Sequence, residues 1–447
     1  MSLTPILFLV VWTFGTLAAL IYGAKFGIYT YIFAFHVSPN HTWWQNLVPD
    51  LRYLMIVGLV AFGTAYARKD PNPGEPWHAH AGFKLFLVFI VWLWLLNLWA
   101  LSDLQMEGST LFTKHLIIAV TIYWLAKDNM VMIKNIMLGM VLGGAWFGWI
   151  TMGKTGRVEG AAGAIADANT LGMHAAAMTM IAAMMFLGLQ RYYRWIPFLC
   201  IPLILNTVIQ SGSRGAFVGL LAGGFTAMYF CPRGMKGRFS VYAVLGVILF
   251  FMLAHDRFMQ RLAETYAALV SEEEQLDGSA TSRFEIAAAG WRMALDYPMG
   301  VGYKGTALLS RYYMPAHVLS GAGKRDDSAR AAHNTIMDAL VSYGFVGVTL
   351  YVLMHIWNVR QLLWLRRVAR ARLDPELSIA VAGVAAALVV VLVAGQFTNY
   401  VYAEIQFWVM GLLCAMRVLV LRMALAPVAA VTREPALPSE VQRIAGA

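Results

Sequence analysis

The chain has 447 residues, of which 60% are hydrophobic and only 13% are charged. Water-soluble domains are about 45–50% apolar and about 25% charged, so this composition excludes a water-soluble fold for most of the chain. The formal net charge is +10. Much of it lies in short loops between apolar segments, which indicates membrane topology and argues against a nucleic-acid partner.

The three cysteines, Cys200, Cys231 and Cys414, lie in or beside apolar stretches, at spacings that fit neither a metal site nor a disulfide framework. The chain starts with uncharged residues that run directly into an apolar stretch. Because this start is not basic and no small-residue cleavage site follows, we expect a retained first helix and not a removed signal peptide.

Long apolar stretches predict about twelve transmembrane helices, since a hydrocarbon core about 30 Å thick needs around 20 apolar helical residues. The predicted spans are 5–24, 50–67, 82–101, 110–126, 129–150, 170–188, 194–211, 214–231, 239–255, 334–357, 378–398 and 400–421. A further apolar piece, 26–38, is either another crossing or a kinked, re-entrant element. This choice decides on which side of the membrane the N-terminus lies.

Basic residues in short loops predict the orientation, because Lys and Arg are enriched on the cytoplasmic side. Four basic blocks fall on one side when the spans alternate. They are Arg68 with Lys69, Arg191 with Arg194, Arg233 with Lys236 and Arg238, and the arginines between 360 and 372. That side is then cytoplasmic, so the loops 151–169 and 257–333 and the junctions at 211–214 and 398–400 face outward.

The loop 257–333 is far longer than an ordinary connection, and such loops are usually functional or disordered. Apolar residues at helical spacing in 257–270 and 284–295 favour a small, partly helical cap. The loop also carries many cations against the positive-inside trend, and for any one of them a solvated surface is the simpler explanation. The expected organisation is an N-terminal transmembrane bundle (1–256), this cap loop (257–333), C-terminal transmembrane helices (334–424) and a disordered cytoplasmic tail (425–447).

The stretch Ser211-Gly212-Ser213-Arg214-Gly215 lies between two apolar runs, at the outward end of both. An arginine at membrane depth is costly and usually marks a substrate path, and its planar guanidinium matches phosphate oxygens. The alternative is an interfacial arginine that snorkels to water. Gly215, Gly219 and Gly223 continue a small-residue stripe, which is most simply explained by close helix packing.

Two further motifs lie in the cap loop. His333-Asn334 closes the loop where the next span begins, and a neutral imidazole there could accept a hydroxyl proton. A helix-capping Asn beside an interfacial His explains the same pair equally well. Residues 300–305 spell GxGxxG, but no buried strand precedes them, so they predict a flexible turn that approaches substrate through its backbone and not a nucleotide-binding loop.

The order of these features resembles the O-antigen ligase and O-antigen polymerase superfamily of bacterial inner-membrane glycosyltransferases. The resembling part covers about residues 165–350. It contains Ser-Gly-Ser-Arg-Gly, Ser282-Arg283-Phe284, Trp291, Pro298, Gly300-Val301-Gly302, His333-Asn334 and the run Asp338–Gly344–Gly347. The N-terminal part also looks like the O-glycosylation ligases associated with exosortase systems.

This resemblance implies a GT-C-type fold that transfers a glycan from undecaprenyl diphosphate to an acceptor hydroxyl at the periplasmic face of the inner membrane, with no metal, cofactor or nucleotide sugar. It implies that Arg214 and Arg283 bind the diphosphate and that His333 activates the acceptor or assists at the reacting centre. The acceptor stays open between lipid A–core, a protein and a growing glycan. Further candidates for the pocket are Ser213, Asn334, Gly302, Asp167, Asn169, Lys154 and Arg157.

Two other classes of function compete with the transferase. A transporter or flippase of a polyanionic lipid would use Arg214 in a translocation path, and a non-catalytic scaffold of an envelope complex would need only the membrane part. A transporter is expected to place charged or broken-helix sites near the bilayer midplane. In this sequence the charges gather at one face and in the cap, which favours an enzyme. The carboxylates of the cap, Glu272–Glu274 and Asp326-Asp327, resemble no metal site, so arginines are expected to neutralise the phosphates.

Overall fold

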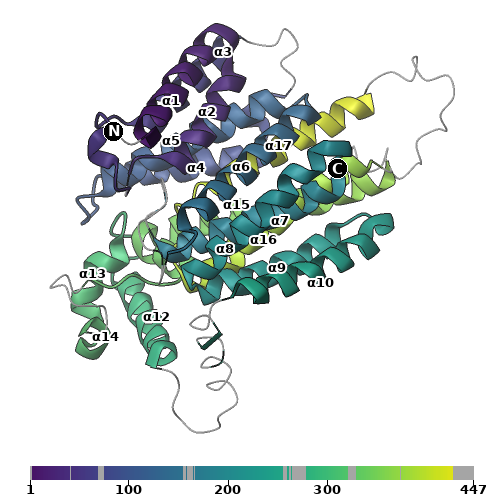
Figure 1. Ribbon diagram of the computed structural model, residues 1–447. Coiled ribbons are helices and arrows are strands. Elements are labelled where there is room, and N and C mark those ends of the chain that lie inside the picture. Colours follow the sequence, from purple (N-terminus) through teal and green to yellow (C-terminus); the bar gives the residue numbers. More distant parts are fainter. Residues whose placement is uncertain are drawn as a thin grey trace.

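The computed structural model describes residues 3–40, 42–68, 75–154, 158, 165, 167–254, 259–260, 263, 278–320, 329–372 and 374–425. All secondary-structure elements in these ranges are helices (Figure 1). The expected all-α polytopic membrane fold is therefore confirmed.

Helices α1 to α10 precede the cap and α15 to α17 follow it. The first group comprises α1 (Leu3–Tyr22), α2 (Ala24–Val37), α3 (Tyr53–Ala67), α4 (Ala81–Leu96), α5 (Gln105–Ala126), α6 (Met130–Thr151), α7 (Ala168–Gly188), α8 (Trp195–Ser211), α9 (Arg214–Phe230) and α10 (Lys236–Leu253). The second comprises α15 (Thr335–Ala371), α16 (Pro375–Ala394) and α17 (Ile405–Leu425). Each predicted span coincides with one of these helices. Nine helices in the described residues are long and apolar enough to cross a membrane, so the expected number of about twelve is not reached by length and composition alone.

The segment 26–38 forms helix α2, which returns through the bundle between α1 and α3. Phe8 near the start of α1 packs edge-on against Tyr53 at the start of α3, with ring centroids 5.0 Å apart. Arg68, just after α3, donates a hydrogen bond to the carbonyl oxygen of Ile21 near the end of α1 (2.6 Å). Thus α1 and α3 run in the same direction. Because only Gly23, with φ 115°, separates α1 from α2, α2 runs against both.

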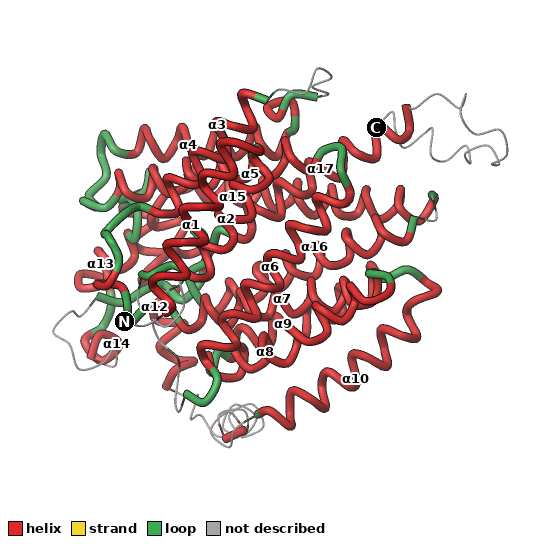
Figure 2. Tube along the Cα trace, turned by 45° about the horizontal axis from the view of Figure 1, so that its top comes forward, coloured by secondary structure: helices red, strands yellow, loops and turns green. Residues whose placement is uncertain are grey.

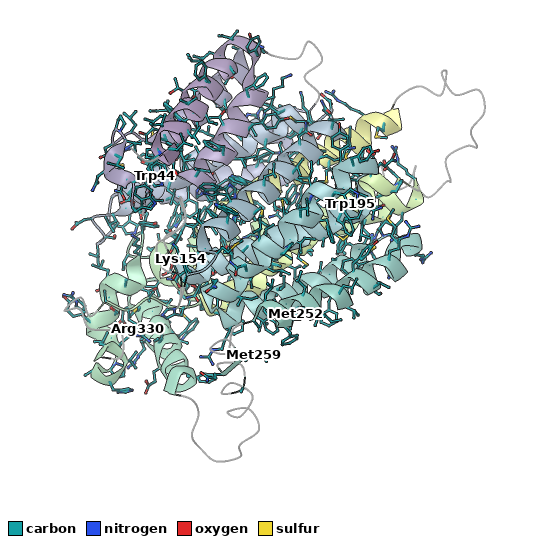
Figure 3. All side chains as sticks on the ribbon, in the orientation of Figure 1. Trp44, Lys154, Trp195, Met252, Met259 and Arg330 are labelled. Carbon is teal, nitrogen blue, oxygen red and sulfur yellow. The ribbon has the colours of Figure 1, made fainter. Side chains whose placement is uncertain are left out.

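The cap consists of α12 (Gly278–Asp296), α13 (Gly305–Tyr313) and α14 (Ala316–Ser320), which gather at one end of the bundle (Figure 1). We call this end the cap face and the other end the basic face. Lys154 and Arg330 lie toward the cap face, and Trp195 lies toward the basic face (Figure 3). The expected cap helix 284–295 corresponds to α12. The other expected cap helix, 257–270, lies almost entirely outside the described residues, as does the tail 425–447 beyond the end of α17.

The centre of the bundle is formed by α7 and α16, which are mostly buried, whereas α1 and α10 expose most of their apolar side chains. Helix α10 stands at the edge of the bundle (Figure 2). The small-residue stripe of α9 packs against α16: a Cβ added to Gly223 would lie 2.6 Å from Cγ2 of Val390. This is the close helix packing expected for Gly215, Gly219 and Gly223.

Helix α15 is longer than its predicted span, 334–357, because it continues past the apolar run to Ala371. The added turns carry the arginines of the basic face. A span predicted from continuous apolar residues ends before these charged positions. Near its other end, Gly344 has φ 70° and breaks the regular helix. The backbone groups that this kink leaves unpaired are used by the cap, as described below.

Candidate functional site

The Ser-Gly-Ser-Arg-Gly stretch forms the corner between α8 and α9 at the cap face. Gly212 has φ 58°, a conformation that glycine adopts without strain. The Oγ of Ser213 accepts a hydrogen bond from the backbone N–H of Ala216 (3.2 Å) and thereby caps α9. Ser213 thus has a structural role in this corner, and Arg214 follows it as the first residue of α9.

Arg214 is half-buried, and its place in the helix has an electrostatic consequence. The N-terminus of a helix carries a partial positive charge, so a cation there opposes the helix dipole. Helix stability therefore does not explain an arginine at this position. A guanidinium and a helix N-terminus together favour a bound anion, and phosphate is an anion that both match.

His333 and Asn334 lie immediately before α15. The Oδ1 of Asn334 accepts a hydrogen bond from the backbone N–H of Met337 (3.0 Å), so Asn334 caps the helix. His333 is half-buried and has φ 50°, which is uncommon for a residue with a Cβ. Strained backbone of this kind persists where the surroundings impose it and is often found at functional sites. The capping explanation thus holds for Asn334 but does not account for the conformation of His333.

The short 3-10 turn η5 (Gly395–Phe397) connects the two predicted motifs. The Nδ2 of Asn334 donates a hydrogen bond to Oε1 of Gln396 (3.2 Å). On the other side of the turn, a Cβ added to Gly215 would lie 2.7 Å from Cβ of Phe397. Arg214 and His333 are therefore next to residues that contact the same turn. Spacing along the chain gives no signal for this proximity.

The segment that follows η5 is buried and anchored from several sides. The Oγ1 of Thr335 donates to the carbonyl oxygen of Thr398 (2.9 Å) and accepts from the backbone N–H of Tyr400 (2.8 Å). The hydroxyl of Tyr400 donates to the carbonyl oxygen of Asn169. The predicted outward junction at 398–400 carries no pattern that indicates these contacts. Asn169 takes part here through its backbone.

Further along this segment, Glu404 is buried within the bundle and forms a polar cluster. Its carboxylate accepts hydrogen bonds from Nζ of Lys114 (2.9 Å), from Nε1 of Trp408 (3.1 Å) and from the hydroxyl of Tyr31. The Nε2 of His115 lies 3.5 Å from the same carboxylate. An acidic residue inside an apolar stretch was the signal in the sequence, because such residues are rare and usually paired.

Of the other pocket candidates, Asp167 has a structural role. Its Oδ2 accepts hydrogen bonds from the backbone N–H (2.8 Å) and Oγ1 (3.0 Å) of Thr170, so it caps α7. Lys154 is exposed at the cap face (Figure 3). Arg157 lies outside the described residues.

The backbone of residue 283 belongs to α12, while its side chain lies outside the described residues. Helix α12 runs parallel to the first turns of α15. A Cβ added to Gly290 would lie 2.7 Å from Cγ of Met337, and farther along the backbone N–H of Phe345 donates to the carbonyl oxygen of Pro298 (3.0 Å). Residue 283 is near the start of α12, and His333 comes just before α15. Because the two helices run in the same direction, residue 283 lies on the cap, toward His333.

The Gly300–Gly302 turn is held firmly and differs from the predicted flexible turn. The backbone N–H of Gly302 donates to the carbonyl oxygen of Ser342 (2.8 Å), one of the groups exposed by the kink at Gly344. The backbone N–H groups of Leu101 and Ser102 donate to the carbonyl oxygen of Val301 (2.9 and 3.0 Å). The turn thus supplies partners for backbone groups that would otherwise be unpaired, and it fastens the cap to the bundle. Gly302 is buried in this junction.

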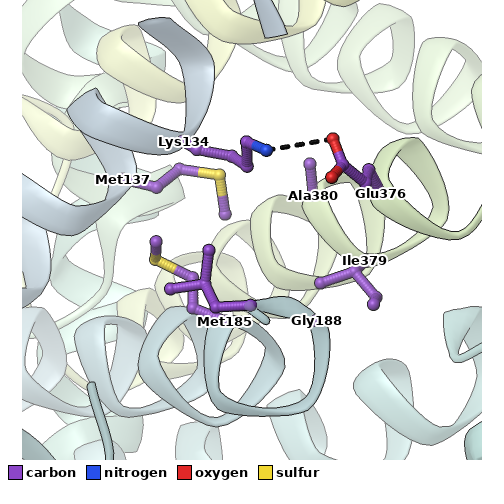
Figure 4. A pocket seen from close by; sticks show the side chains of 8 residues that line it. Lys134, Met137, Met185, Gly188, Glu376, Ile379 and Ala380 are labelled. Carbon is purple, nitrogen blue, oxygen red and sulfur yellow. Dashed lines mark hydrogen bonds and ion pairs between the residues drawn. The ribbon is translucent and has the colours of Figure 1, made fainter. Parts of the chain in front are cut away.

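A small pocket lies elsewhere, between α6, α7 and α16 (Figure 4). Lys134 and Glu376 meet there, with Nζ and Oε2 3.0 Å apart. Both residues are in the first turns of helices that start at the basic face, so this pocket is remote from Arg214 and His333. Among the described residues, no group of three or more His, Cys, Asp or Glu is arranged to hold a metal ion.

Residues 198–352 match the family model described as O-antigen ligase. This match supports the O-antigen ligase superfamily for this part of the chain. The ligase segment runs from α8 to the middle of α15 and includes Arg214, residue 283 and His333. It confirms the resemblance that the motifs indicated over about residues 165–350. No match to the chain was found among curated proteins.

Proposed function

We propose that the protein is a GT-C-type glycan ligase of the bacterial inner membrane. It transfers a glycan from undecaprenyl diphosphate to an acceptor hydroxyl at the periplasmic face. The observation that carries this proposal is that Gly215 and Asn334, the residues next to Arg214 and His333, both contact the turn η5. Arg214 and His333 themselves lie in the segment that matches the O-antigen ligase family. A cation suited to phosphate and an imidazole suited to a hydroxyl are the two groups that this reaction needs.

In the proposed reaction, the acceptor oxygen attacks the anomeric carbon of the donor glycan. The bond from that carbon to the diphosphate oxygen breaks, and the diphosphate leaves with the electron pair. Arg214, together with Arg283 from the cap, neutralises the charge that develops on the leaving group. Such electrostatic stabilisation is often the largest catalytic effect. His333 accepts the proton from the acceptor hydroxyl as a general base.

Arginines in these roles make a metal ion unnecessary in the proposed reaction, because the leaving group is already a stable diphosphate. The acceptor belongs to one of three classes: lipid A–core, a protein, or a growing glycan, as in a polymerase. These differ in what approaches His333 and not in how the donor is held. The donor lipid and the surrounding membrane lipids are the other partners.

A transporter or flippase of a lipid-linked glycan is the second candidate, and one observation favours it. The Glu404 cluster and the irregular segment 398–404 lie inside the bundle, and charged groups beside broken helices are typical of transport sites. However, the carboxylate of Glu404 is fully paired within the protein, which is typical of a structural cluster.

The two candidates are separated by an assay in proteoliposomes that contain the purified protein, a lipid-linked glycan and a soluble acceptor. A ligase forms the glycan–acceptor product, and EDTA leaves the rate unchanged. A flippase moves the donor across the bilayer without forming product. Arg214→Ala, Arg283→Ala and His333→Ala are each expected to reduce product formation strongly while the protein stays in the membrane. Arg311→Ala, at an exposed arginine of the same cap, is the matched control. Full activity in all three site variants would contradict the proposal.

A further inference from the structure

Arginines converge on one backbone carbonyl at the basic face. Arg366 and Arg370, one turn apart on α15, both donate hydrogen bonds to the carbonyl oxygen of Tyr229 near the end of α9 (3.1 and 3.2 Å). The guanidinium carbon of Arg366 lies 3.5 Å from the centre of the Tyr229 ring, a cation–π contact. Burial, followed by the neighbouring charges of Arg366 and of Arg233 in the turn after α9, lowers the pKa of Arg370.

Within the described residues, these charges have no acidic partner. None of the ion pairs there involves Arg233, Arg366 or Arg370. The two carboxylates at the start of α16 are already used: Asp374 accepts from the backbone N–H of Leu377 (3.0 Å), and Glu376 pairs with Lys134.

The arginines also have unused donors. The Nε atoms of Arg366 and Arg370 are buried and have no hydrogen-bond partner within the described part of the chain. A buried donor without a partner costs free energy, and so do like charges held close together. The positive-inside trend explains why basic residues lie at this face, but it does not require them to meet at one carbonyl. An anion bound between the guanidiniums would remove both costs.

An apolar surface leads directly to these arginines. Val218, Leu221, Phe225 and Tyr229 recur at helical spacing on α9, and all are exposed, Phe225 to 78%. In a membrane this stripe faces lipid. It ends at Tyr229, where the guanidiniums are held. The arrangement therefore places a cationic site at the depth of the headgroups and an apolar track beneath it.

We infer that Arg366, Arg370 and Arg233 bind the phosphate of an anionic phospholipid in the leaflet at the basic face, with an acyl chain along the α9 stripe. Basic pockets between transmembrane helices are suited to such headgroups, and guanidiniums bind phosphate through two parallel hydrogen bonds. The site is independent of the proposed transfer reaction. It lies at the other end of α9 from Arg214.

The test is a lipid titration of the purified full-length chain, followed by native mass spectrometry. Phosphatidylglycerol is expected to bind more tightly than phosphatidylcholine. In Arg366→Gln/Arg370→Gln this preference falls by on the order of tenfold or more, because both basic contacts are lost. The matched control is Arg360→Gln/Arg367→Gln, which removes the same charge from exposed positions of the same helix and keeps the preference. Arg366→Lys/Arg370→Lys retains the charge and loses part of the preference with the planar fork.

Three results would overturn the inference. The first is an equal affinity of the unaltered protein for the two lipids. The second is an equal loss in the Gln pair and in its control, which would indicate attraction by net charge alone. The third is binding of glycerol 3-phosphate as tight as that of phosphatidylglycerol, which would indicate a site for a soluble phosphate. If the Gln pair does not fold, the Lys pair still decides: an undiminished preference there contradicts binding through the guanidinium forks.

Discussion

Asn334 donates a hydrogen bond from Nδ2 to Oε1 of Gln396 (3.2 Å), and so joins the residue after His333 to the turn that packs against Gly215. If this contact positions His333 relative to Arg214, Gln396→Ala should lower the transfer rate without changing the affinity for the donor. Asn334→Ala should also lower Tm, because losing a helix N-cap costs about 1 kcal/mol. Asn334→Asp keeps the cap and loses the donor to Gln396, so it should behave like Gln396→Ala. Transfer assays and thermal unfolding of the three variants check this, and an unchanged rate in Gln396→Ala would contradict a positioning role.

Substitutions at His333 that suit its backbone conformation can distinguish its chemical role from its structural one. With φ 50°, this position suits Gly or Asn better than His. His333→Gly and His333→Asn are therefore expected to fold with an unchanged or higher Tm. Both lack a base, so product formation should fall by about 10²–10⁴-fold. A rate in His333→Asn close to that of the unaltered protein would show that the imidazole is not the proton acceptor.

Replacing Arg214 or Arg283 by lysine should change the transfer rate measurably. Removing one charge-stabilising group costs about 10²–10³-fold in rate, which is the loss expected for Arg214→Ala and Arg283→Ala. Lysine restores the charge but not the planar fork. Arg283→Lys and Arg214→Lys should therefore recover only part of this loss, measured as kcat/KM for the lipid-linked donor. Full activity in Arg283→Lys would argue against bidentate phosphate binding.

Glycines at the junction of cap and bundle should be intolerant of substitution. Gly300 and Gly344 have φ 84° and 70°, and a Cβ on either would lie within 2.5 Å of backbone atoms of the other segment. Positive φ alone costs on the order of 1–3 kcal/mol, so Gly344→Ala and Gly300→Ala should strongly reduce the yield of folded protein. Gly63→Ala is the control, because a Cβ there meets nothing within 4 Å. Size-exclusion profiles and thermal unfolding of the detergent-solubilised variants distinguish these outcomes.

Apolar runs predicted much of the fold, because lipid selects continuous hydrophobic helices and each predicted span coincides with one. The cap helix at 284–295 also followed from its periodicity. Periodicity could not predict contacts between distant segments. These are the approach of Gln396 to Asn334 and the hydrogen bond from the Gly302 N–H to the kinked part of α15. These depend on tertiary packing, which leaves no local pattern. Arg214 and His333 were predicted as site residues from their positions beside membrane spans and from the family resemblance, and their roles stay predictions, while Gln396 and Glu404 had no matching motif.

Glu404 offers a last test, because its pairing with Lys114 can be removed from either side. Breaking one side of a buried ion pair costs about 3–5 kcal/mol, whereas replacing both partners costs much less. Glu404→Gln and Lys114→Met should therefore each lower Tm strongly, and the double variant should recover much of the loss. Recovery of glycan transfer in parallel with Tm would show that the cluster acts by holding the segment 398–404 beneath the site. A double variant that regains its Tm but not its transfer activity would instead place the charges themselves on the path of the substrate, as a transporter requires.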